Sequence, residues 1–205
     1  MSSNIKSQAI RVLAEMLVVF VGVYAAFGLE SARSKRAEAA RGRQMLVAMQ
    51  HDFADSQQSL DDAVPSVVAV VDSFLASHEA GGMPEIGHLA LSMSFRSGAW
   101  DAMMQSGGVN LLDVDFILLV EEYYRLVQTL SDRTDEGRQM STALILPRLN
   151  DGNSVFYDPD TRRLRPSYRW YLAMLREFSD QIQLIHQKNG DLLERVNGML
   201  NENGV

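Results

Sequence analysis

The chain has 205 residues, which is the size of one ordinary domain with a short extension. It contains no cysteine, and this excludes disulfides, thiolate metal sites, cysteine nucleophiles and cysteine lipidation. The formal net charge is −7, but residues 1–43 carry seven cations against three carboxylates, a balance of +4, which leaves −11 for residues 44–205. An acidic body excludes nucleic acid as the main partner, because phosphate binding needs a positive face on the folded domain.

The first predicted element follows a short tail, residues 1–11. Residues 12–29 form an apolar run whose one charged side chain is Glu15. As a helix this run would be about 27 Å long, just under the hydrocarbon thickness of a bilayer, and we predict that it is a transmembrane helix. Glu15 would lie near one interface, where a carboxylate costs far less than at the midplane.

Three alternatives compete with a transmembrane helix for this run. A secretory signal peptide has the same shape, with Lys6 and Arg11 as its basic start and the small residues of 25–28 as cleavage sites. The other two are a buried core helix and a helix that lies in the membrane plane. Both are disfavoured, because no face of residues 16–29 is polar.

A basic neck, residues 30–43, follows the apolar run. Its cations are Arg33, Lys35, Arg36, Arg41 and Arg43. They outnumber Lys6 and Arg11 on the other side, so the positive-inside rule predicts a single pass with the N-terminus outside and the C-terminal domain in the cytoplasm. The neck cations would also attract the lipid bilayer where its headgroups are anionic.

Small residues lie on one face of the predicted span. Gly22 and Ala26 are four residues apart, with Val18 one turn earlier. This spacing lets a second helix approach closely, and it predicts packing against another membrane-protein subunit.

Residues 44–205 are predicted to form an antiparallel helical bundle. Apolar residues at helical spacing extend the first helix to about residue 62, namely Met45, Met49, Phe53, Leu60 and Val64. Pro65 is expected to mark a break or the first turn of a second helix, which is expected to end at Gly81-Gly82. A short third helix carries Trp100 and ends at Gly107-Gly108.

Two further helices complete the predicted all-α fold. The first covers residues 113–146, and its late core positions, Thr134, Gly137 and Ser141, predict looser packing at that end. Residues 150–166 predict an irregular loop or a small hairpin around Asp158-Pro159.

The last helix has the clearest pattern, a seam with four-three spacing. Its members are Tyr171, Leu175, Phe178, Ile182, Ile185, Asn189, Leu192, Val196 and Met199. Such a seam packs either against a partner chain, with Asn189 fixing the register and a homo-oligomer as one outcome, or inside this chain's own bundle. The internal packing is favoured.

No group of residues has the spacing of a catalytic, cofactor-binding or metal site. His51 and Asp55 lie four residues apart, as in half of a metal site, but an exposed polar helix face explains them better. The sequence lacks the repeated Glu-x-x-His motif of di-iron proteins, and it has no nucleophile elbow and no phosphate loop. We therefore predict a protein that is not an enzyme and needs no cofactor.

Two blocks of sequence resemble a known family. The first is the pattern formed by Glu15, Leu17, Val18, Val19, Gly22, Val23 and Ala26, and the second contains Trp100, Ser106, Gly107, Gly108, Tyr123 and Tyr124. Together they resemble an uncharacterised bacterial family of single-pass membrane proteins, known only as a domain of unknown function. The resemblance implies a bacterial inner-membrane protein with an anchor helix and a helical extramembrane domain, and it implies no activity.

Two classes of function agree with these features. The first is a non-enzymatic accessory or scaffold subunit that docks on a larger bacterial membrane complex and stabilises it; a respiratory or photosynthetic assembly is one such class. The second is a membrane-anchored sensor or regulator that binds a ligand. A broad apolar surface would favour the first, and a pocket with titratable groups from several helices would favour the second.

Overall fold

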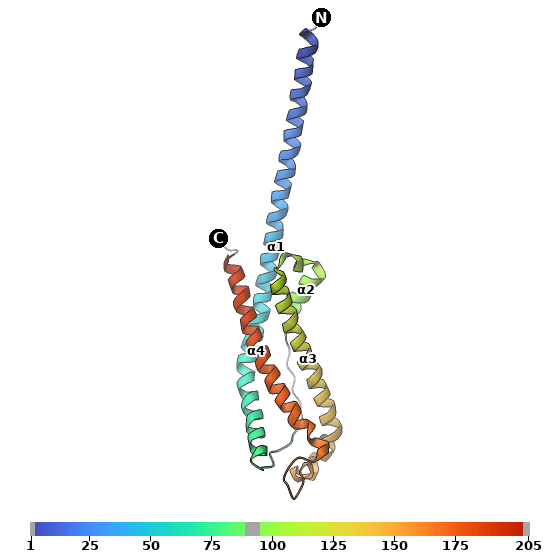
Figure 1. Ribbon diagram of the computed structural model, residues 1–205, viewed down its shortest axis with the longest axis vertical. Helices are drawn as coiled ribbons and strands as arrows, with labels where there is room; N and C mark the ends of the chain where they lie inside the picture. The colour runs from blue at the N-terminus through green and yellow to red at the C-terminus, as the bar shows by residue number, and fades with distance from the viewer. Residues whose placement is uncertain (1–2, 89–94, 203–205) are drawn as a thin grey trace. The chain divides into compact units, whose positions relative to one another are not determined.

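The computed structural model describes the backbone of residues 3–88 and 95–202 (Figure 1). It describes their side chains too, except at residues 3–15, 17–19, 22, 25 and 202. All named elements in the described ranges are helical, so the all-α prediction is confirmed for them. The chain forms two compact units, Met1–Gln44 and Met45–Val205, which are described separately.

The unit Met1–Gln44 consists of the N-terminal part of helix α1 (Ser3–Glu79). By length and hydropathy, none of the helices in the described part of the chain qualifies to cross a bilayer. The predicted transmembrane helix over residues 12–29 therefore has no support from the structure. Many side chains of that segment lie outside the described residues, and the span stays a prediction from the sequence.

Helix α1 continues through Pro65 to Glu79, so the predicted break at this proline is wrong. A proline inside a helix removes one backbone hydrogen bond and costs about 3 kcal/mol. Pro65 is exposed, which lets water solvate the carbonyl that loses its partner. Leu60 and Val64 before it and Val71 after it are buried, and this packing on both sides of Pro65 offsets the cost.

Three long helices lie side by side in the unit Met45–Val205: the C-terminal part of α1, α3 (Val114–Leu144) and α4 (Trp170–Glu202) (Figure 1). Helix α4 runs antiparallel to both others, whereas α1 and α3 run in the same direction (Figure 1). The predicted antiparallel arrangement is thus wrong for this pair. The cause is that α1 ends at one end of the unit and the next helix, α2 (Gly98–Ser106), begins at the other.

The termini of α2 and α3 follow from local sequence. Gly107 ends α2 in the left-handed conformation, with φ 72°, which glycine adopts without steric cost. A short 3-10 helix, η1 (Gly108–Leu111), leads to Asp113, whose carboxylate accepts a hydrogen bond from the Asp115 N–H and caps α3. The predicted stop at Gly107-Gly108 is confirmed, and so is the long helix after residue 113.

The core has two clusters of buried side chains. The larger holds Phe53, Phe116, Tyr123 and Ile182, and it fills the space between α1, α3 and α4. The smaller surrounds Phe156 and Tyr157 at the other end of these helices.

The prediction of loose packing at the end of α3 is wrong, because Gly137 and Ser141 are buried. Small size is the reason for their burial. A Cβ on Gly137 would lie only 2.0 Å from the Met174 sulfur of α4, so the two helices approach closely at this point.

The segment between α3 and α4 is an irregular loop with three 3-10 helices, η2 (Leu146–Asp151), η3 (Asn153–Phe156) and η4 (Pro166–Tyr168). The predicted hairpin is reduced to one antiparallel bridge, Tyr157 to Leu164, and no strand forms in the described ranges. The Tyr157 hydroxyl donates a hydrogen bond to the Pro84 carbonyl at 2.7 Å, which fastens this loop to the segment after α1.

Candidate functional site

A run of exposed apolar side chains lies on the unit Met1–Gln44. Seven large apolar side chains between residues 16 and 29 are 46–71% exposed: Met16, Phe20, Val21, Val23, Tyr24, Phe27 and Leu29. The Phe20 and Tyr24 rings, one helical turn apart, contact each other at a tilt of 40° with centroids 4.7 Å apart. Contiguous exposed apolar surface of this kind marks a contact with a membrane or with another protein.

The predicted small-residue face is described at one position. Ala26 is exposed, and Val18 and Gly22 lie outside the residues whose side chains the structure describes. Packing of this face against a partner helix therefore stays a prediction.

The five neck cations, Arg33, Lys35, Arg36, Arg41 and Arg43, are all exposed. Between them Ser34 donates a hydrogen bond to Glu38 at 3.2 Å, which is a local contact within one turn. The neck is therefore a charged helix surface that follows directly on the apolar segment.

The seam of α4 is buried in the chain's own core. Tyr171, Leu175, Phe178, Ile182, Ile185, Asn189, Leu192 and Val196 are buried, and Met199 is half-buried. Of the two interpretations, the structure shows the internal one. The Asn189 side-chain amide donates hydrogen bonds to the Phe53 carbonyl at 2.9 Å and to Gln57 Oε1 at 2.8 Å, so it joins α4 to α1.

The block around residues 97–127 forms an aromatic cluster at the end of the unit where α1 enters it. The Trp100 and Tyr124 rings stack with centroids 6.3 Å apart, and the Phe53 and Tyr123 rings meet edge to face at 5.7 Å. Burial raises the pKa of both Tyr123 and Tyr124, so both phenols are neutral. Asp52 completes the cluster by accepting a hydrogen bond from the Ala99 N–H in the first turn of α2. These contacts hold α1, α2 and α3 together, so the block has a structural role.

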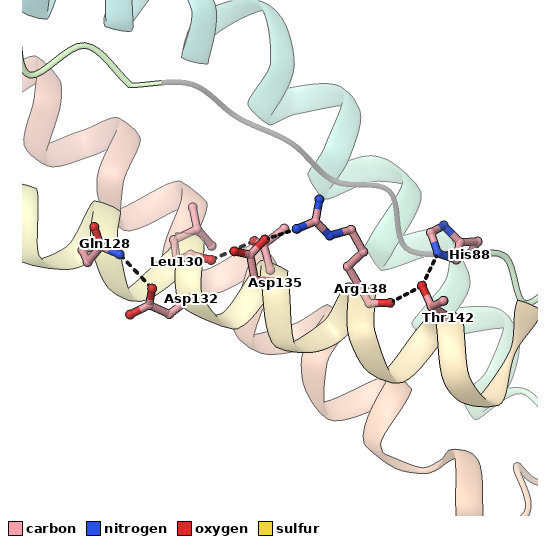
Figure 2. Close-up of polar contacts among 8 residues, drawn as sticks. His88, Gln128, Leu130, Asp132, Asp135, Arg138 and Thr142 are labelled. Carbon is pink, nitrogen blue, oxygen red and sulfur yellow. Dashed lines mark hydrogen bonds and ion pairs between the residues drawn. The ribbon is translucent and has the colours of Figure 1, made fainter.

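Polar residues elsewhere lie in ion pairs and hydrogen bonds at the surface of the described part of the chain. Asp55 is paired with Arg96 at 2.5 Å, and no three acidic or histidine side chains in the described part of the chain are grouped to hold a metal ion. On the outer face of α3, Gln128 bonds Asp132 and Arg138 bonds Asp135 within one turn, as Figure 2 shows. Another contact in that view joins residues far apart in the sequence, His88 and the Thr142 hydroxyl, at 3.1 Å. These are the contacts of a solvated helix face.

A polar chain links α1 to α4 beside the buried Asn189. His186 Nε2 lies 2.6 Å from Asp61 Oδ1, and the Gln57 amide donates to the same oxygen at 2.9 Å. The hydrogen bond with His186 is the main reason that the pKa of Asp61 is lowered, and the bond from Gln57 lowers it further. The pair spans the two helices on their exposed side.

Several hollows lie among the helices of the unit Met45–Val205. One of about 160 Å³ lies between α3 and α4 around Met174, and one of about 280 Å³ lies around Phe74 and Tyr171. A larger one is an open groove of about 650 Å³ between α1 and α4. It is lined by Val64, Pro65, Val68, Ala69, Asp72, Gln183, Leu184, His186 and Gln187.

The sequence patterns missed this groove. They identified the seam, which is the inner face of α4, whereas Leu184 lies outside the seam and is 40% exposed. The signal that could have found it is Leu184 together with the apolar residues Val68 and Ala69, which add a second apolar edge to α1 and α4.

No protein-family model matches the sequence, and no curated protein or solved structure shows significant similarity to it. The structure itself defines the class of protein: a helical protein with an exposed apolar segment, a basic neck and an acidic helical unit.

Proposed function

We propose that this protein is a membrane-anchored accessory subunit that docks on a larger bacterial membrane complex and stabilises it. The observation that supports this most is the set of seven exposed apolar side chains between residues 16 and 29. A soluble helix would leave this surface in water, where each large apolar group costs about 1.5–3 kcal/mol relative to burial. A bilayer or a partner helix removes that cost.

The basic neck supports the membrane as the first partner. Five exposed cations begin within a turn or two of the apolar segment, which is where cytoplasmic flanks of spanning helices carry them. Each cation near an anionic surface adds about 1 kcal/mol of attraction. In this proposal the N-terminus is outside and the acidic unit is in the cytoplasm. The resemblance to a bacterial single-pass family implies the anchor helix.

The role of the acidic unit is to bind protein. Its seam and its aromatic cluster are used inside the chain, and its half-open hollows of about 160 and 280 Å³ are smaller than the roughly 300–1,000 Å³ of typical ligand pockets. The groove of about 650 Å³ reaches that size, but it is open to solvent along the two helices and would not bury a small molecule. A sensor that binds a small molecule is therefore supported less than a scaffold subunit.

Protease protection tests the orientation. The full chain is expressed in bacteria, and right-side-out and inverted inner-membrane vesicles are treated with protease. We expect the unit Met45–Val205 to be digested in inverted vesicles and protected in right-side-out ones. Digestion in the opposite pattern would reverse the orientation, and recovery of the chain outside the membrane fraction would contradict the anchor.

Purification in mild detergent, followed by mass spectrometry, tests the docking. We expect stoichiometric recovery of other membrane-protein subunits with the tagged chain. Recovery of the chain alone, or as a simple homodimer, would contradict the accessory role.

A further inference from the structure

We propose that the groove between α1 and α4 docks one basic amphipathic helix of a partner protein. This inference rests on the proposed function, because it names the surface by which the accessory subunit binds its partner. All residues that form the groove belong to the unit Met45–Val205.

The floor of the groove is formed by apolar residues of α1 and by Leu184, while Gln183, His186 and Gln187 line its α4 side. Val64, Val68 and Ala69 of α1 face Leu184 of α4 across an open volume of about 650 Å³. The lining of α1 extends from Val64 to Asp72, which is about 12 Å along a helix axis. A helix laid into a groove places side chains about one turn apart on such a floor.

Acidic side chains stand at the ends of the groove. On α1, Asp61 and Asp72 flank the apolar residues, and helical spacing puts them on one face about 16 Å apart. On α4, Asp180 and Asp191 flank Leu184 in the same way. Because α4 runs antiparallel to α1 and His186 contacts Asp61, the α4 residues before His186 lie toward Asp72 and those after it lie past Asp61. Asp180 is therefore toward the Asp72 end of the groove, and Asp191 is toward the Asp61 end.

Few cations of the chain offset these carboxylates. Asp72, Asp180 and Asp191 are exposed, and none has an ion-pair partner among the described residues. Lys188 of α4 is paired with Glu122 of α3 at 2.9 Å, and Arg176 is paired with Glu79 at 2.8 Å. His186, at 2.6 Å from Asp61, is the one basic side chain in the lining.

These features together select the occupant. An apolar floor between acidic ends fits a helix with one apolar stripe and Lys or Arg about three turns apart. The same carboxylates repel the phosphates of anionic lipid and nucleic acid, so neither of these fits the groove.

A model peptide tests the proposal on the full-length chain in neutral detergent. The probe is a fluorescein-labelled helical peptide of about 18 residues with Leu at one-turn spacing and Lys at both ends of the stripe. Fluorescence anisotropy is measured, and binding to empty micelles is subtracted. We expect saturable binding that the double variant Asp72→Lys/Asp180→Lys weakens about tenfold or more. A rise in salt should also weaken it, because exposed charges are screened.

The matched control is Glu121→Lys, which reverses an exposed carboxylate on α3 away from the groove. We expect it to leave peptide affinity within about twofold of wild type. A second variant, Leu184→Glu, should reduce binding through the apolar floor. Circular dichroism checks folding, and the exposed Asp72→Lys/Asp180→Lys variant tests the groove even where Leu184→Glu unfolds the chain.

Three outcomes would overturn the proposal. One is equal affinity of wild type and the Asp72→Lys/Asp180→Lys variant, and another is an equal loss with Glu121→Lys. The third is a combination of two results: wild type does not bind the peptide, and Leu184→Glu changes the oligomeric state of the chain. It would mean that a second copy of this chain occupies the groove. Membrane retention of the same preparation is measured separately, so failure of the groove and failure of the anchor are told apart.

Discussion

At the scale of single residues, Asn189 determines how α4 sits on α1. It is fully buried in an otherwise apolar seam, and its amide group donates to the Phe53 carbonyl and to Gln57. A shift of α4 by one turn would move this amide away from both acceptors and leave it unpaired in the core. Asn189 thus sets the register between two helices of one chain, which is the role that the sequence pattern had left open to a partner chain.

Replacing Asn189 with Ala should lower the free energy of unfolding by about 1–3 kcal/mol, because Gln57 loses a buried partner and a small cavity forms. Urea denaturation of the full chain in detergent, followed by circular dichroism, measures it. The control is Gln187→Ala, an exposed position on the same helix that should change the unfolding free energy by less than about 0.5 kcal/mol. Equal effects of the two variants would show that Asn189 has no special role.

The Asp61–His186 pair should make stability depend on pH in the acid range. The pKa of Asp61 is lowered in the folded chain, so its contribution is complete above the unfolded value, near 3.9, and is lost as the pH falls through the folded value. The advantage of wild type over Asp61→Asn in urea midpoint should therefore shrink below about pH 4. Asp62→Asn is the control for a neighbouring exposed carboxylate, and an advantage unchanged down to about pH 2 would contradict the assignment.

At the scale of helices, the sequence pattern of a single segment predicted the features that depend on nearby residues alone, namely helix ends and apolar faces. The α4 seam follows from its spacing, the end of α2 from Gly107, and the start of α3 from Asp113. The misses depend on contacts distant in sequence. Pro65 stays helical because the residues around it are buried, and Gly137 is buried because Met174 packs against it, and neither fact is visible in a short window. The groove was missed for the same reason, since it needs α1 and α4 together.

Replacing Pro65 with Ala should stabilise the chain. Alanine restores the N–H that can bond the Asp61 carbonyl, and it removes the steric clash of the ring inside a helix. The gain should be about 1–3 kcal/mol in unfolding free energy, measured by the urea midpoint. Ser66→Ala, at the next exposed position of α1, should gain only a few tenths of a kcal/mol. A destabilised Pro65→Ala variant would show that the proline is accommodated without cost.

At the scale of the whole molecule, the two units have surfaces suited to different surroundings. The unit Met1–Gln44 exposes large apolar groups and then a row of cations, while residues 44–205 carry the −11 charge and bury two apolar clusters. Water solvates the acidic surface of the second unit well, but it leaves the large apolar groups of the first unit exposed. The proposed anchor resolves this difference by giving each unit its own medium.

The anchor makes a prediction that separates lipid from a protein partner as the medium of the first unit. Phe20 and Phe27 are 63% and 71% exposed and lie seven residues apart, near the middle and one end of the proposed span. Replacing both with Arg should release the chain from membranes, because a central Arg costs about 2.5–3.5 kcal/mol on insertion scales. Wild type should stay in the pellet after carbonate extraction, and Phe20→Arg/Phe27→Arg should move to the supernatant. Ser31→Arg/Ser34→Arg adds the same charge to the neck and should stay in the pellet. If wild type itself is extracted by carbonate, these aromatic side chains contact a protein and not the bilayer interior.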